Sequence, residues 1–383
     1  MTPRERIQAA INHRAHDKLA IDIGATFATG ITARAYHALR QTLELGGDPI
    51  RIDDPAQLLA EVEIPVLKAL GSDVVGVRAY GGHFYGWHAW ELSPGLEVLV
   101  AKNIEIQKRS DGGWDQYIDG KLKNIMPREG LYFDSAEYTP WYTYGPKLYT
   151  EAVLRNLEDR LSYYQTETDY AVFYNSPFSI SNATNPDYSC ALLIEKEEAQ
   201  ERIGVWMDSL LENLKMVLDV LRDRADVISF SGDAGSQRKA LCPPEVYREM
   251  IVPQVRRVTD YVHKHSNIKC FLHSCGSVYE LIECFIEMGM DILNPVQLSA
   301  ANMEPERLAR EFGGRIVFWG GGCDTQHALP HHTPEGVRQE VRDRLGVFAR
   351  QPGYVFSQVH NIQPDVPVEN ILAMTNEIRR SDT

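Results

Sequence analysis

Three residues with soft ligand atoms stand near the ends of two apolar runs in the second half of the chain. His273 and Cys275 close the run 269–275, and Cys323 follows the run 316–322. Residues two apart in an extended strand point to the same side, so His273 and Cys275 can share one ion. Zinc prefers imidazole and thiolate ligands, and three protein ligands with an open fourth position are typical of a catalytic site. This spacing predicts a zinc site made of His273, Cys275 and Cys323.

The predicted site would activate a nucleophile. A zinc ion bound by two thiolates and an imidazole is a mild Lewis acid that lowers the pKa of an incoming thiol or hydroxyl. Hydrolysis by zinc-bound water is less suited to it, because two thiolates make that water less acidic. The competing interpretation is structural: both cysteines would be inert buried thiols, and His273 would be hydrogen-bonded in the core.

Eight apolar runs must position these residues. They are continuous rather than alternating, as in parallel strands that are covered on both faces. The runs span 19–25, 73–80, 170–176, 227–233, 269–275, 292–297, 316–322 and 354–360. Helical patterns between them cover 33–45, 55–70, 146–165, 196–224, 244–263, 278–288, 305–312, 334–350 and 368–379. The alternation predicts a (β/α)8 TIM barrel, with residues 1–383 as one domain. A doubly wound sheet is the alternative, but no GxGxxG motif opens a helix after a strand.

One segment, residues 81–146, interrupts the alternation. It is rich in aromatic residues and in turn pairs such as Asp119-Gly120, and the stretches 98–100 and 104–107 read as strands. We expect a β-hairpin insertion after the second barrel strand, acting as a lid or as the surface of a homodimer.

Polar side chains follow the expected strands, at the end of a barrel where active sites lie. Such groups are costly there unless they face a shared pocket. The candidate acid–base residues are Asp22, Asp233 and His360. The candidate substrate-binding residues are Arg78, Tyr174, Asn175, Gln237, Asn294, Gln297 and Asn361.

Composition excludes several classes of function. The formal net charge of −14 argues against nucleic acid or an anionic membrane as the main partner. The six cysteines are scattered through the chain, which argues against a disulfide framework. The first residues are polar, and no apolar run approaches the roughly 18 residues that cross a bilayer. We therefore expect a soluble cytoplasmic protein.

Several segments together resemble the uroporphyrinogen decarboxylase-like superfamily, and more closely its corrinoid-dependent methyltransferase branch. They are residues 4–6, 22–24, 231–233, 242–247, 271–276, 291–297, 321–326 and 360–367. The resemblance implies a (β/α)8 barrel and a zinc ion held by a His-x-Cys…Cys arrangement, which His273, Cys275 and Cys323 match. Zinc methionine synthases are similar there but add a glutamate, whereas Asn294 and Gln297 stand at the end of the sixth strand here. That leaves water, substrate, Asp233 or Gln297 as the fourth ligand.

The resemblance implies a zinc-dependent methyltransferase that exchanges a methyl group between a small compound and a corrinoid. This chain lacks a DxHxxG-type cobalamin segment, so methylcobalamin or a related corrinoid would come from a partner protein. The alternative is a cofactor-free decarboxylase or lyase of a small acid. Porphyrinogen decarboxylation is disfavoured, because residues 25–31 lack the arginines that bind substrate carboxylates in those enzymes. A third interpretation is a barrel with a decayed site that only binds a ligand or partner.

Overall fold

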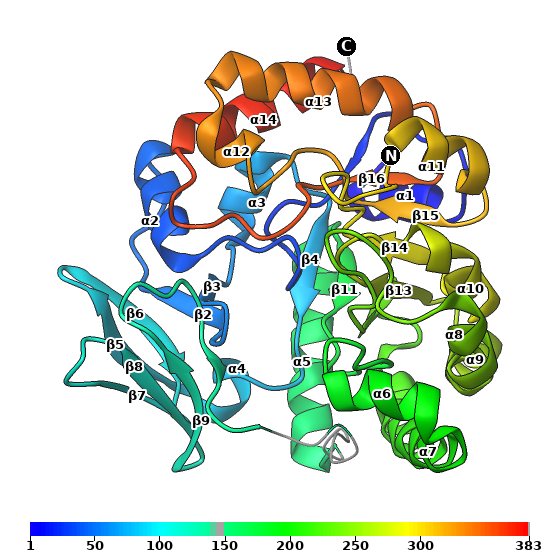
Figure 1. The fold of residues 1–383 in the computed structure, drawn as a ribbon. Helices are drawn as coiled ribbons and strands as arrows, with labels where there is room; N and C mark the ends of the chain where they lie inside the picture. Colours follow the sequence, from blue (N-terminus) through cyan, green and yellow to red (C-terminus); the bar gives the residue numbers. More distant parts are fainter. Residues whose placement is uncertain (139–140, 142–148, 382–383) are drawn as a thin grey trace.

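Eight parallel strands form the centre of the molecule, in the hydrogen-bonded order β1-β16-β15-β14-β13-β12-β11-β4 (Figure 1). The computed structural model describes residues 1–138, 141 and 149–381. The strands are β1 (Ala20–Ile21), β4 (Val74–Val77), β11 (Ala171–Tyr174), β12 (Val227–Ser231), β13 (Lys269–His273), β14 (Ile292–Asn294), β15 (Val317–Trp319) and β16 (Tyr354–Phe356). Each lies within one of the eight predicted runs, which confirms the (β/α)8 TIM barrel.

The barrel closes between β1 and β4 through contacts of Ser72 and Asp73 rather than through a ladder of paired strands. The Asp73 N–H donates to the Ile21 carbonyl at 2.7 Å, and the Ile21 N–H donates to Asp73 Oδ2 at 3.1 Å. Ile23 N–H also donates to Ser72 Oγ at 3.3 Å. We call this joint the seam; the other neighbouring strands of the barrel are joined by parallel pairing.

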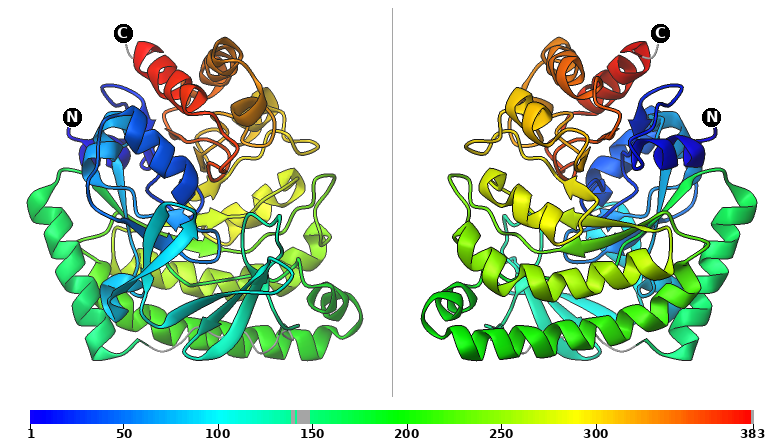
Figure 2. Two further views of the ribbon diagram at one scale, coloured as in Figure 1. Left: turned by 90° about the vertical axis from the view of Figure 1, so that its left-hand side faces the viewer. Right: turned by 90° about the vertical axis from the view of Figure 1, so that its right-hand side faces the viewer.

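Helices surround the strands, and the long helix α7 runs along the outside of the barrel (Figure 2). They are α1 (Pro3–Ala10), α2 (Ala33–Thr42), α3 (Ile64–Leu70), α4 (Gly82–Tyr85), α5 (Glu151–Glu167), α6 (Pro186–Ile194), α7 (Lys196–Leu221), α8 (Pro244–Met250), α9 (Val252–His265), η2 (Tyr279–Leu281), α10 (Ile282–Glu287), α11 (Pro305–Phe312), α12 (Ala328–His331), α13 (Pro334–Phe348) and α14 (Val368–Ser381). Among the described residues, no helix combines the length and the apolar character that crossing a membrane requires.

The helix expected over 55–70 is only partly present. Asp54 Oδ1 accepts hydrogen bonds from the Ala56 and Gln57 N–H groups at 3.0 Å, which makes a turn where the helix was expected to begin. Strand β3 (Leu59–Ala60) follows, and α3 begins at Ile64 with Pro65 in its first turn. The expected helix start at 146 lies outside the described residues.

Helix α1 covers the bottom of the barrel, opposite the ends where a site is expected. Its N-terminus is capped by Thr2, which forms a capping box with Glu5, as its sequence indicates. Ile7 and Ile11 pack with the inward-facing side chains of the strands, among them Phe173, Phe271 and Trp319. The lower part of the barrel interior is therefore a filled core.

The segment after β4 is larger than a single hairpin. Strands β7 (Ile104–Lys108), β8 (Trp114–Ile118), β9 (Lys121–Met126) and β10 (Asp134–Ser135) form one antiparallel sheet. A second sheet joins β5 (Trp87–Ser93) and β6 (Leu96–Ala101) to β2 (Ile50–Asp54) and β3. Both sheets lie to one side of the barrel (Figure 1). Of residues 139–146, the structure describes only Trp141, so the end of the predicted insertion is outside it.

Candidate metal and substrate site

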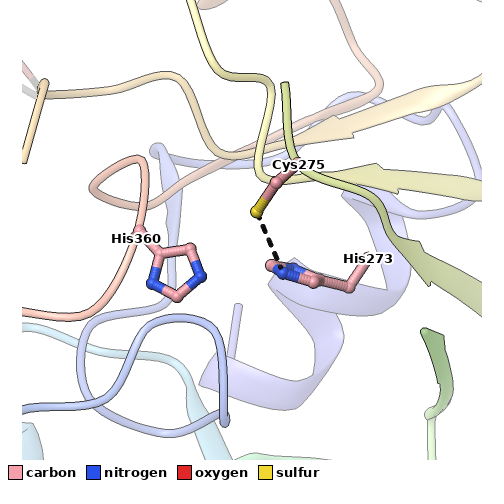
Figure 3. A group of neighbouring side chains, drawn as sticks. All are labelled: His273, Cys275 and His360. Atoms are coloured by element: carbon pink, nitrogen blue, oxygen red, sulfur yellow. Dashed lines mark hydrogen bonds between the residues drawn. The ribbon is translucent and has the colours of Figure 1, made fainter. Parts of the chain in front are cut away.

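His273, Cys275 and His360 gather at the upper end of the barrel. Their ligand atoms all lie within 4.8 Å of one another. Cys275 Sγ is 3.3 Å from His273 Nε2, as expected for residues two apart at the end of one strand. The His360 ring faces both from the loop after β16, with its centroid 5.3 Å from that of His273 (Figure 3). We call these three residues the donor group.

His273 is held from behind by an asparagine. The side chain is buried, and its Nδ1 lies 2.6 Å from Asn294 Oδ1 at the end of β14. The other end of the same amide donates from Nδ2 to the Trp319 carbonyl oxygen at 2.9 Å. The ring edge of Phe27 also packs against His273, with centroids 5.2 Å apart. The imidazole is therefore fixed in orientation, with Nε2 directed at Cys275.

His360 is neutral at physiological pH. Burial, and to a smaller extent the neighbouring His273, lower its pKa to about 4, although Asp233 opposes the shift. The Asn361 N–H donates to His360 Nδ1 at 2.8 Å, so the hydrogen of the neutral ring is on Nε2. Nε2 is the nitrogen that faces His273 and Cys275 (Figure 3).

Asp233 lies beside the donor group. Its Oδ1 accepts a hydrogen bond from the Cys275 N–H at 2.8 Å, which joins the end of β12 to the residue after β13. Burial raises the pKa of the Cys275 thiol well above its ordinary value, and the Asp233 carboxylate adds to the shift. Without a bound cation, Cys275 is therefore a protonated thiol.

The structure does not bring Cys323 into the donor group. Its thiol is buried and lies 3.9 Å from Glu340 Oε2 on α13. The glycines before it turn the chain: φ is 137° at Gly320 and 67° at Gly321, so the position of Cys323 after a barrel strand does not bring its thiol to the donor group. The structure places His360 where the sequence interpretation placed Cys323.

Asp22 points into the barrel core rather than toward the donor group. Its Oδ2 accepts hydrogen bonds from Trp319 Nε1 at 2.9 Å and from Thr29 Oγ1 at 3.0 Å. Burial raises the pKa of Asp22 to about 6, against the stabilising effect of these donors. Asp22 thus connects β1 to β15 beneath the site.

Apart from Asn294, which holds His273, the predicted substrate-binding residues divide into two sets, and they have partners within the protein. Arg78 is ion-paired with Asp53 at 2.7 Å and with Asp54 at 3.2 Å. The Tyr174 hydroxyl is buried against that of Tyr149 at 2.7 Å. These contacts place Arg78 and Tyr174 in the β4–α5 side of the barrel wall.

A second set surrounds the loop after β1. Asn175 Oδ1 accepts from the Phe27 N–H at 3.1 Å, and Asn361 Nδ2 donates to the Phe27 carbonyl at 3.0 Å. Gln297 accepts from the Gly276 N–H at 2.8 Å and donates to Gln237 Oε1 at 3.1 Å. These amides hold the loops around the donor group. Sequence reasoning missed Phe27, because nothing polar marks it and only its contact with His273 gives it a role.

Another group of possible ligands, His263, Cys270 and Asp291, lies at the opposite end of β13. Its carboxylate is already occupied: Asp291 Oδ2 is bound by His263 Nε2 at 2.7 Å and by the Cys270 N–H at 2.8 Å. Lys269 Nζ lies 3.1 Å from Asp291 Oδ1. A lysine ammonium on the carboxylate disfavours a cation there, so this group is an ion-pair network that fastens α9 to β13.

Comparison with solved structures confirms the barrel. A methyltransferase from Methanosarcina mazei superposes with a TM-score of 0.61 at 13% sequence identity, covering all of both chains. At this identity the likeness shows the fold.

Comparison of sequences identifies the family. A uroporphyrinogen decarboxylase of Pseudoalteromonas translucida (strain TAC 125) is 25% identical over 183 residues, which are 44% of this chain. The matched region spans about half of that relative, 48% of its length. The family model for uroporphyrinogen decarboxylase (URO-D) matches residues 153–381. These residues carry β11–β16 and the whole donor group, in agreement with the resemblance found in the motifs. The chain belongs to the uroporphyrinogen decarboxylase (URO-D) family.

Proposed function

We propose that this protein is a zinc-dependent methyltransferase. It would move a methyl group between a small methylated or methoxylated compound, or a thiol acceptor, and the cobalt of a separate corrinoid protein. The observation that carries the proposal is the donor group: one thiol and two imidazoles, within 4.8 Å of one another, after the C-terminal ends of β13 and β16. The structural neighbour is itself named as a methyltransferase, which is consistent with this proposal.

The donor group fits zinc in its chemistry and spacing. Thiolate and imidazole are its usual ligands, and three of them leave a fourth position for a substrate. His273 Nε2 and Cys275 Sγ are 3.3 Å apart, close enough to bind one ion. His360 can join through Nε2 only after its hydrogen moves to Nδ1, which breaks the bond from the Asn361 N–H. His273 and Cys275 are therefore the two ligands that need no change of tautomer before they bind zinc.

Bound zinc would supply Lewis acidity that lowers the pKa of a thiol or hydroxyl. The protein would do the rest. His273 and Cys275 would orient the reacting sulfur or oxygen, and Phe27 would limit the room beside them. In transfer to a thiol, the S–H proton leaves, a sulfur–carbon bond forms, and the cobalt–carbon bond breaks with its electron pair kept by cobalt. Asp233, which accepts a hydrogen bond from the Cys275 N–H at 2.8 Å, is a carboxylate that could take up this proton.

The second candidate is a cofactor-free decarboxylase of a small carboxylic acid, favoured by the family match. A decarboxylase needs a cation to bind the substrate carboxylate. Arg78, the one arginine among the predicted substrate-binding residues, is held by Asp53 and Asp54. A substrate carboxylate would have to displace both acids to bind Arg78, which counts against Arg78 as the residue that binds it.

Two measurements on the purified protein test the proposal: its zinc content, and the absorbance of methylcobalamin mixed with it and a simple thiol. We expect about one zinc per chain and a loss of the methyl–cobalt absorbance. Cys275→Ala should abolish both, whereas His332→Ala, which replaces an exposed histidine of a surface loop, should leave both at the wild-type level. A wild-type protein without zinc that leaves methylcobalamin unchanged would contradict the proposal. Release of CO2 from a small acid by the Cys275→Ala variant would favour the decarboxylase.

A further inference from the structure

The side-chain amide of Asn294 joins the donor group to the barrel wall through both of its ends. It is fully buried at the last position of β14. Oδ1 lies 2.6 Å from His273 Nδ1, and Nδ2 lies 2.9 Å from the Trp319 carbonyl oxygen.

The Trp319 carbonyl determines which way the amide is turned. A carbonyl oxygen only accepts hydrogen bonds, so the amide nitrogen of Asn294 must face it. The amide oxygen then faces His273, and it too only accepts. His273 must therefore carry its hydrogen on Nδ1, which leaves the lone pair of Nε2 directed at Cys275.

The position of Trp319 is itself fixed. Its indole Nε1 donates to Asp22 Oδ2 at 2.9 Å, and its side chain is buried in the barrel core. A continuous series of contacts thus runs from Asp22 through Trp319 and Asn294 to His273. The tautomer of His273 depends on this series and not on solvent, because every member is buried.

We propose that Asn294 is a positioning residue that locks His273 in the tautomer with a free Nε2 and thereby sets the affinity of the donor group for zinc. This proposal rests on the proposed metal site. His360 has the opposite arrangement, since its Nδ1 accepts a backbone hydrogen bond. The two histidines then differ in role: His273 is ready to bind before the metal arrives, and His360 has to change its tautomer.

Three variants separate positioning from stability. Asn294→Leu removes the acceptor for His273 and the donor for Trp319. Asn294→Asp keeps an acceptor oxygen for His273 and loses the donor. Asn370→Leu is the matched control. Asn370 lies on α14, is also buried, and donates to the Leu329 and His332 carbonyl oxygens at 2.9 and 2.8 Å.

The readouts are the 15N shifts of His273 in zinc-free protein and zinc affinity by competition with a chelator. The resonance is assigned with His273→Gln in protein labelled at histidine. We expect a protonated Nδ1 in the wild type, in Asn294→Asp and in Asn370→Leu, and a mixture of tautomers in Asn294→Leu. Zinc affinity should fall about 10- to 100-fold in Asn294→Leu and stay near the wild-type level in the other two variants.

The outcomes distinguish this proposal from the function on which it rests. An unchanged His273 tautomer in Asn294→Leu, or zinc affinity equal to that of the wild type, would overturn the role of Asn294. A wild-type protein that binds no zinc would instead contradict the proposed function, and the role of Asn294 in affinity with it.

Discussion

His273 and His360 lie side by side, but their Nδ1 atoms have opposite roles. Nδ1 of His273 donates a hydrogen bond, and Nδ1 of His360 accepts one. His273 receives its orientation from a side-chain amide, and His360 from the backbone N–H of the residue that follows it. The difference suggests an order of metal binding. His273 and Cys275 would bind first, and His360 would complete the set at the cost of one hydrogen bond, typically about 1 kcal/mol net.

The third ligand can be identified by comparing His360→Gln with Cys323→Ser. The first removes an imidazole from the donor group, and the second changes a buried thiol that lies against Glu340. We expect zinc affinity to fall at least about tenfold in His360→Gln and to stay within about twofold in Cys323→Ser, measured by chelator competition. Loss of zinc in Cys323→Ser alone would restore the original assignment of Cys323.

Asp22 should make stability depend on pH. Burial raises its pKa from 3.8 to about 6 in the native state, so between these values the native protein holds a proton that the unfolded chain has lost. The resulting stabilisation is complete below about pH 4 and is lost as the pH rises through 6, by up to about 3 kcal/mol.

Denaturant unfolding of the wild type and Asp22→Asn at several values between pH 4 and 7 measures this effect. The variant should lose less stability than the wild type across that interval, because its amide does not titrate. Parallel curves for the two proteins would show that the native pKa of Asp22 is not raised.

At the scale of elements, helix α1 is joined to the strands by a buried ion pair. Arg6 is only 4% exposed and pairs with Asp73, whose side chain is 3% exposed, as well as with Asp17. Without Arg6, the buried Asp73 carboxylate would lose its ion-pair partner and keep the hydrogen bond from the Ile21 N–H. Asp73 also closes the seam, so α1 and the barrel share this carboxylate.

We therefore expect Arg6→Met to lower the free energy of unfolding by about 3–5 kcal/mol, measured in denaturant. Arg4→Met is the control on the same helix. The partner of Arg4 is Asp226, which keeps hydrogen bonds from Gln8 Nε2 at 2.8 Å and from the Val172 N–H at 2.9 Å. The free energy of unfolding should therefore fall less in Arg4→Met than in Arg6→Met. Equal losses in the two variants would contradict a special role for the Arg6–Asp73 pair.

The elements also explain how far the sequence could predict the site. Continuous apolar runs identified the eight strands, and the two-residue period placed His273 beside Cys275. The regular alternation of side-chain directions ends after β15, where glycines with positive φ turn the chain before Cys323. His360 was predicted as a catalytic residue but not as a neighbour of Cys275. Its loop is placed by long-range backbone bonds, such as Ile362 N–H to Gly30 O at 2.9 Å, which no local pattern encodes.

At the scale of the molecule, the family model matches the later part of the chain and not the earlier part. Residues 153–381 contain the donor group, Asp233 and Asn294. Phe27, Asp22, Arg78 and the two small sheets precede that region. Under the proposed function, the later part would supply the ligands for zinc, and the earlier part would shape the space for a substrate.

The seam is the junction of the barrel where two neighbouring strands are not joined by a β-ladder. Strands β12 and β13 are paired over five residues, whereas β1 has two residues, pairs with β16 on one side and meets β4 only through the contacts of residues 72–73. Local opening of a folded protein occurs most readily where the fewest contacts hold the backbone, which in this barrel is the seam. In hydrogen–deuterium exchange, the amides of Ile21 and Asp73 should therefore become labelled before those of Ile228 and Leu272. The first motion of the barrel would be a parting of its two ends, directly beneath the loop that carries Phe27.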